Sequence, residues 1–207
     1  MELKENKKQT IQGIIDRLST LTNRVEIVDE NVDEMIDSFD RGYPFDMEAP
    51  QSIILHSIEL RGYVHLSRKR KALLCFEVVS PDSLLVDICF YGAKDDVPEW
   101  NQLGIKSEES ADFTDFLKEL YRVYKFKVGT ISMLGSILEL FGCEELYPNN
   151  CYRYENLSPD FFLSERIPLI SIIWNEKYKR LRDIPYKYHR FEEDGILIEL
   201  GSFVEWY

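Results

Sequence analysis

The sequence predicts an α+β fold in which a mainly antiparallel sheet packs against amphipathic helices. Hydrophobic residues recur at helical spacing over 10–21 and 113–124, whereas over 52–91 they alternate or cluster between polar turns. Strands that follow one another, with helices inserted between groups of strands, are typical of this class. The chain of 207 residues is expected to form a single globular domain, 1–207.

Helices are predicted where one stripe of the helix is apolar. The helix at 10–21 aligns large aliphatic side chains, namely Ile11, Ile14, Ile15, Leu18 and Leu21. A shorter helix is expected at 31–39, and Gly42 ends it. The helix at 113–124 has the clearest pattern, and a further short helix is expected to begin at Ser158, which can cap it.

Strands are predicted at 52–58, 60–66, 72–79, 84–91, 126–133, 169–174, 188–192 and 196–200. Asp194-Gly195 indicates a tight hairpin between the last two. Within the meander at 52–91, turns centred on Lys69 and on Asp82 bring apolar side chains together on one face. Burial of one face selects the register of a sheet, so we expect these two registers.

With these registers, the opposite face of the meander carries three cross-strand rows: Arg61, Glu77 and Asp87; Tyr63, Cys75 and Cys89; His65, Leu73 and Tyr91. Glu77 directly opposite Asp87 is a like-charge pair that Arg61 could neutralise. In this interpretation, the row of Arg61, Glu77 and Asp87 is a salt-bridged part of a face that is either solvated or covered by a helix. Alternatively, Arg61, His65, Glu77 and Asp87 line a pocket, because two close carboxylates can share a proton or hold a cation.

Acidic residues are concentrated between Glu26 and Glu48, in a chain whose formal net charge is -12. We expect three of them, Asp33, Glu34 and Asp37, on the polar side of the helix at 31–39. Tyr43 and Phe45 follow in a loop that contains glycine and proline. These five residues are interpreted as a docking surface for a basic protein, in which charge speeds encounter and aromatic anchors supply affinity. The alternative is a solvated acidic helix face.

Common catalytic and metal-binding motifs are missing from the sequence, which has no phosphate-binding loop, no nucleophile elbow and no metal-binding histidine pattern. We therefore assign no catalytic residue, cofactor or metal. The four cysteines do not have the spacing of a zinc site, and free thiols in a reducing cytoplasm are expected. Apolar runs are far shorter than the roughly 20 residues of a membrane span, and no signal peptide is recognisable, so a cytoplasmic location without a membrane partner is expected.

These features favour a non-catalytic protein-binding module, most specifically an acidic inhibitor of a basic toxin or nuclease, that is, an immunity-type protein. A small hydrolase or metal-dependent enzyme at the Glu77, Asp87 and His65 face is the first alternative. A nucleic-acid-associated regulator is the second, because basic residues and tyrosines alternate over 177–190. The acidic net charge disfavours nucleic acid as a partner. The sequence does not predict an oligomeric state.

Overall fold

The computed structural model describes residues 1–49, 51–92, 96–98, 101–132, 136–157 and 169–200. It divides the chain into unit 1, residues 1–91 and 144–156, and unit 2, residues 92–143 and 157–207. The predicted α+β class with mostly antiparallel sheets is confirmed. A single domain spanning the whole chain stays a prediction, and each unit is described by itself below.

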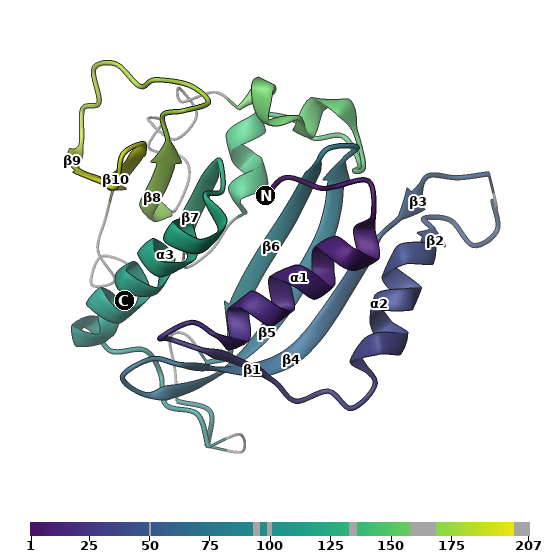
Figure 1. The fold of residues 1–207 in the computed structure, drawn as a ribbon, viewed down its shortest axis with the longest axis horizontal. Helices are drawn as coiled ribbons and strands as arrows, with labels where there is room; N and C mark the ends of the chain where they lie inside the picture. The colour runs from purple at the N-terminus through teal and green to yellow at the C-terminus, as the bar shows by residue number, and fades with distance from the viewer. Residues whose placement is uncertain (50, 93–95, 99–100, 133–135, 158–168, 201–207) are drawn as a thin grey trace. The chain divides into compact units, whose positions relative to one another are not determined.

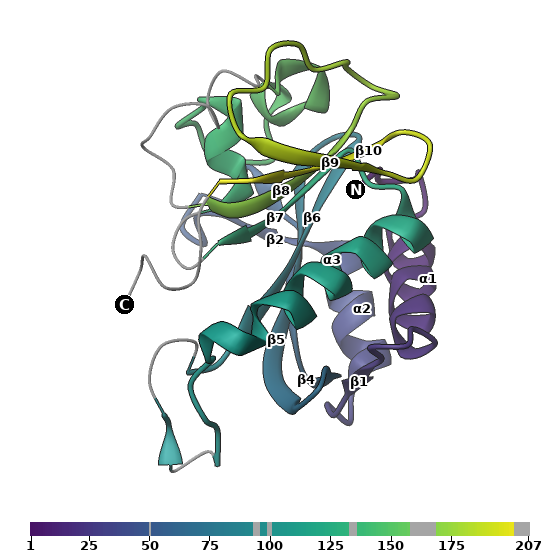
Figure 2. The ribbon, with the colours of Figure 1, turned by 90° about the vertical axis from the view of Figure 1, so that its left-hand side faces the viewer.

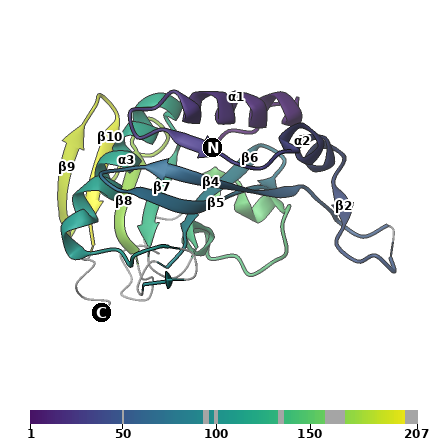
Figure 3. The same ribbon diagram turned by 90° about the horizontal axis from the view of Figure 1, so that it is seen from below.

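Unit 1 is built on an antiparallel sheet of order β1–β4–β5–β6, with β1 (Val25–Ile27), β4 (Ser57–His65), β5 (Lys69–Ser80) and β6 (Ser83–Phe90). Helix α1 (Lys7–Ser19) crosses one face of this sheet, and α2 (Val32–Arg41) lies beside α1 toward β4, as Figures 1 and 3 show. A small hairpin of β2 (Tyr43–Pro44) and β3 (Ile54–Leu55) follows α2. Two 3-10 helices, η4 (Asn150–Tyr152) and η5 (Tyr154–Asn156), complete the unit.

The core of unit 1 lies between α1 and the inner face of the sheet. Four of the five aliphatic residues on the predicted helical stripe lie in α1 and are buried: Ile11, Ile14, Ile15 and Leu18. The fifth, Leu21, lies just beyond α1 and is also buried. Leu60, Leu74 and Phe76 are fully buried on the sheet. α1 begins at Lys7, earlier than predicted, because the Asn6 side chain caps it by accepting a hydrogen bond from the Gln9 amide at 2.8 Å.

Two details of the predicted strands in unit 1 are wrong. The segments 52–58 and 60–66 were expected as separate strands, but Ser57–His65 is one strand, β4, and only Ile54–Leu55 pairs before it. The basic residues 68–71 were expected in a turn. Instead, β5 begins at Lys69, and Arg70 is only 2% exposed.

Unit 2 holds a second antiparallel sheet of order β7–β8–β10–β9, with β7 (Val128–Ser132), β8 (Leu169–Asn175), β9 (Lys187–Phe191) and β10 (Gly195–Glu199). Helix α3 (Ser110–Tyr124) follows the 3-10 helix η2 (Ser107–Glu109) and packs on β7 and β8 (Figure 2), and η3 (Ile137–Phe141) follows β7. The predicted helix at 113–124, the buried strand at 169–174 and the C-terminal hairpin are confirmed. The helix expected from Ser158 lies outside the described residues.

None of the helices in the described ranges is both long enough and apolar enough to span a bilayer.

Candidate functional site

Both predicted registers of the meander are wrong, although the predicted faces are right. β4 and β5 turn around Ser67, so that His65 pairs with Lys69 and Arg61 pairs with Leu73. β5 and β6 pair Cys75 with Asp87, and an irregularity between Val78 and Ser80 shifts the strand next to the turn. Each error is an even number of residues, and side chains alternate with a period of two. The inner and outer faces of the sheet are therefore as expected.

Glu77 and Asp87 lie on the outer face, but not directly opposite each other. Glu77 faces Leu85 across the ladder, so the two carboxylates are diagonal neighbours, for which Cβ atoms are typically about 7–8 Å apart. Burial, with a smaller contribution from the charge of Glu77, raises the pKa of Asp87 to about 6. The Tyr147 hydroxyl donates a hydrogen bond of 2.9 Å to Glu77.

Arg61 and His65 have partners other than the two carboxylates. The Asp29 carboxylate accepts hydrogen bonds from the Arg61 amide at 2.6 Å and from its guanidinium Nε at 2.7 Å. His65 Nε2 lies 2.8 Å from the Glu26 carboxylate. Hydrogen bonds from Lys69 and His65 lower the pKa of Glu26 to about 2. The structure therefore does not bring together the four residues Arg61, His65, Glu77 and Asp87 as one pocket.

Cysteine chemistry also differs from the expectation of four free thiols. Cys75 and Cys89 are free, whereas Cys143 and Cys151 are disulfide-bonded. Cys75 and Cys89 are diagonal rather than directly opposite neighbours on the outer face, because Leu73 pairs with Cys89. The thiol–thiol hydrogen bond raises the pKa of Cys75 and lowers that of Cys89, so the pair holds one proton more tightly than the other.

Titration of the protein, unfolded without reductant, with a chromogenic thiol reagent is expected to find two reactive groups. A variant carrying Cys75→Ser and Cys89→Ser should then give none, because the other two sulfurs are already oxidised. Four reactive groups in the unsubstituted protein would contradict the disulfide. That result would instead support the reduced state expected for a cytoplasmic protein.

The acidic residues predicted on α2 occupy its outward side, but they do not have equal surroundings. Asp33 and Glu34 are exposed in the first turn, where negative charge is favourable. Asp37 is half-buried and ion-paired with Lys8 of α1, whose hydrogen bond lowers the pKa of Asp37. Asp33 and Glu34 are therefore more available to a partner than Asp37.

The hairpin after α2 exposes an unusual amount of apolar surface. Its exposed large side chains are Tyr43, Phe45, Met47, Ile53 and Ile54, and Phe45 is 56% and Met47 77% exposed. Backbone pairing holds them in place, because Tyr43 pairs with Leu55 and the Phe45 amide donates to the Ile53 carbonyl at 2.8 Å. The Tyr43 hydroxyl lies 2.7 Å from the Ser57 hydroxyl, which fixes the ring near the start of β4. The predicted aromatic anchors thus lie on a hairpin with backbone pairing.

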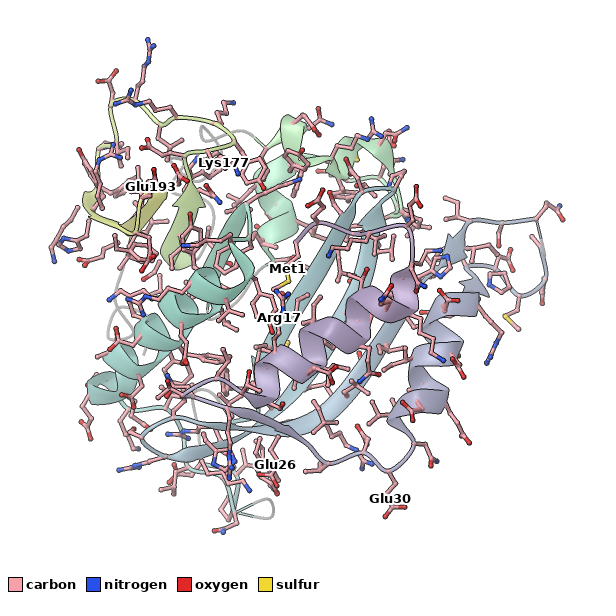
Figure 4. All side chains as sticks on the ribbon, in the orientation of Figure 1. Met1, Arg17, Glu26, Glu30, Lys177 and Glu193 are labelled. Carbon is pink, nitrogen blue, oxygen red and sulfur yellow. The ribbon has the colours of Figure 1, made fainter. Side chains whose placement is uncertain are left out.

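An open groove of about 790 Å³ is lined in part by the first turns of α2, and we call it the acidic groove. Its lining residues come from the β1–α2 connection, α2 and the outer face of the sheet: Val28, Asp29, Glu30, Asn31, Glu34, Met35, Ser38, Glu59, Arg61, Leu73 and Tyr91. Figure 4 shows the labelled side chain of Glu30 projecting outward from this connection. The lining of the acidic groove combines carboxylates with apolar side chains.

Sequence reasoning did not predict the acidic groove. It depends on the pairing of Asp29 with Arg61, which are 32 residues apart, and on Glu59, which was assigned no role. The one local signal was the density of acidic residues in 26–48. That signal indicates a charged surface but not the sheet residues that face it.

Comparison with known proteins gives no match: no family model, no curated protein and no solved structure corresponds to this chain. The class that the structure itself defines is an α+β protein with antiparallel sheets, whose unit 1 presents an acidic helix and an exposed apolar hairpin.

Proposed function

We propose that the protein is a non-catalytic binding module that docks a basic protein. Its docking surface consists of Asp33, Glu34 and Asp37 of α2 together with Tyr43 and Phe45 of the hairpin. The observation that carries the proposal is the exposed apolar hairpin directly after an acidic helix. Large apolar side chains held outward on an ordered hairpin are typical of protein interaction sites, and neighbouring carboxylates select a basic partner.

An inhibitor of a basic toxin or nuclease, acting in the cytoplasm, is the specific form of this function that we propose. Acidic binding surfaces suit such a role because they can cover a cationic active-site region and speed its capture. Asp37 contributes less than its neighbours, since Lys8 already neutralises it. The aromatic anchors are expected to supply most of the binding energy.

The test begins with affinity capture from the native host, identification of the captured protein by mass spectrometry, and surface kinetics with that purified protein. Phe45→Ala is expected to speed dissociation about 30-fold, the effect of losing a buried anchor worth about 2 kcal/mol. The triple variant Asp33→Asn, Glu34→Gln and Asp37→Asn is expected to slow association on the order of tenfold at low salt. The association rate of the unsubstituted protein should fall as salt rises.

Leu103→Ala is the matched control, because Leu103 in unit 2 is 52% exposed, close to the exposed fraction of Phe45. It should leave both rate constants unchanged. Unchanged binding by Phe45→Ala and by the charge triple would show that α2 and the hairpin are only a solvated surface, and the proposal would fail.

A further inference from the structure

Three carboxylates in the lining of the acidic groove receive no counter-charge from any described residue. Glu30, Glu34 and Glu59 make no ion pair with any residue in the described part of the chain, and all three are exposed. The groove does contain Arg61, but its guanidinium lies 2.6 Å from the Asp29 carboxylate, whose side chain is only 8% exposed. Among the lining residues that the structure describes, the only cation is thus paired with Asp29, and the other charged side chains are negative.

Apolar side chains line the same groove as these carboxylates. Leu73 of β5 and Met35 of α2 are half-buried, and Val28 is 44% exposed. Tyr91, directly after β6, adds an aromatic ring to the lining, and its amide donates to the Lys71 carbonyl at 3.3 Å. A lining that combines apolar side chains with carboxylates matches a side chain that has an aliphatic stem and a cationic head.

We propose that the acidic groove binds an arginine side chain presented by an extended segment of the basic partner. The methylene stem lies on Leu73 and Met35, and the guanidinium donates charge-assisted hydrogen bonds to Glu34 and Glu59. Arginine fits better than lysine, because its planar fork can engage two carboxylates at once and can stack on the ring of Tyr91. This inference rests on the proposed function for the charge of the partner, and it adds a second attachment point next to Glu34, which belongs to both the groove and the docking surface.

The probe is a blocked peptide, Arg-Gly-Arg-Gly-Arg, titrated into the full chain at low salt while amide chemical shifts are recorded. Shifts are expected around Glu34, Glu59 and Leu73, and the lysine version of the peptide should bind more weakly. The version with citrulline, which keeps the shape of arginine but has no charge, should not bind measurably. Glu34→Gln combined with Glu59→Gln should weaken binding of the arginine peptide about fivefold or more, as expected for the loss of two charge-assisted contacts.

The matched control is Asp16→Asn combined with Asp40→Asn, which removes the same charge from exposed helical positions outside the groove. It should change the affinity less than about twofold, since only screened long-range attraction is lost. Equal weakening by both double variants would overturn the inference, because binding would then reflect net charge alone. Shifts that avoid the groove, or equal binding of the citrulline peptide, would also overturn it.

The outcomes separate this inference from the proposed function. If Phe45→Ala impairs partner binding but the peptide does not bind the groove, only the arginine slot is wrong. If the peptide binds the groove as described but Phe45→Ala has no effect on the partner, the docking surface is wrong and the slot stands. Thermal unfolding of each variant, followed by circular dichroism, is the control for folding. Substitutions at these exposed sites are expected to leave the fold intact.

Discussion

Replacement of Gly42 by alanine is expected to destabilise unit 1 by about 3 kcal/mol. Gly42 ends α2 with φ 69° and ψ 179°, a backbone conformation that is essentially restricted to glycine. An added Cβ would also lie 2.6 Å from Ile54 Cγ2 and 2.7 Å from the Leu55 carbonyl oxygen. That oxygen belongs to the backbone of the hairpin and cannot rotate away, so strain and steric overlap add together. Urea unfolding measured by circular dichroism provides the test.

Gly13→Ala is the matched control within the same unit. Gly13 lies in α1 with no neighbouring heavy atom within 4 Å of an added Cβ, so alanine there should stabilise by about 0.5–1 kcal/mol. A Gly42→Ala protein as stable as the unsubstituted one would mean that the junction of α2 and the hairpin differs from that described. Because Tyr43 follows directly, the same substitution should also weaken docking of the partner.

The second large effect concerns Asp87 and pH. Its pKa is about 6 in the folded protein against an ordinary value of 3.8, so the folded state binds this proton more tightly than the unfolded state does. The associated stability is fully present below about pH 4 and is lost as pH rises through about 6. A shift of this size corresponds to about 3 kcal/mol, and we expect about 2 kcal/mol because Asp87 is partly accessible to water.

Asp87→Asn removes this titration without changing the shape of the side chain. Relative to the unsubstituted protein, the variant should gain about 2 kcal/mol of unfolding free energy between pH 4 and pH 7.5, measured by urea unfolding at each pH. Asp16→Asn, on the exposed side of α1, is the control for the loss of one negative charge. Parallel stability curves for Asp87→Asn and the unsubstituted protein would show that Asp87 titrates normally. Its proximity to Glu77 would then have no energetic consequence.

Local sequence patterns determined the helices α1 and α3, the C-terminal hairpin and the two faces of the meander. The apolar stripe of α1 and the hydrophobic periodicity of α3 can be recognised from residues a few positions apart. At that range, spacing along the chain directly determines which side of a helix each residue occupies. The same holds for the hairpin before Gly195, whose turn residues are consecutive. The alternation at Leu74 and Phe76 likewise identified the buried face, since a strand's period of two is independent of its partner.

Cross-strand positions were decided only by the tertiary structure. Arg70 is buried, and the basic residues around it belong to β5 rather than to a turn. The irregularity between Val78 and Ser80 changes the pairing of β6 with β5 next to their turn. Neither turn centre therefore follows from the apolar pattern. A register displaced by two or four residues leaves the same side chains on the inner face. Hydrophobic burial alone therefore does not distinguish these registers, and hydrogen bonding and turn geometry select among them.

The acidic groove shows the same limit most clearly. The density of acidic residues that includes Glu34 is visible along the chain, but the pairing of Asp29 with Arg61 joins segments that only the folded sheet places side by side. Such a pair has no spacing rule, because the chain between its members can take many lengths at little cost in loop-closure entropy. Composition and periodicity therefore determined the class of the fold and the charge of its surface. Long-range packing decided which charges are neutralised and which remain available to a partner.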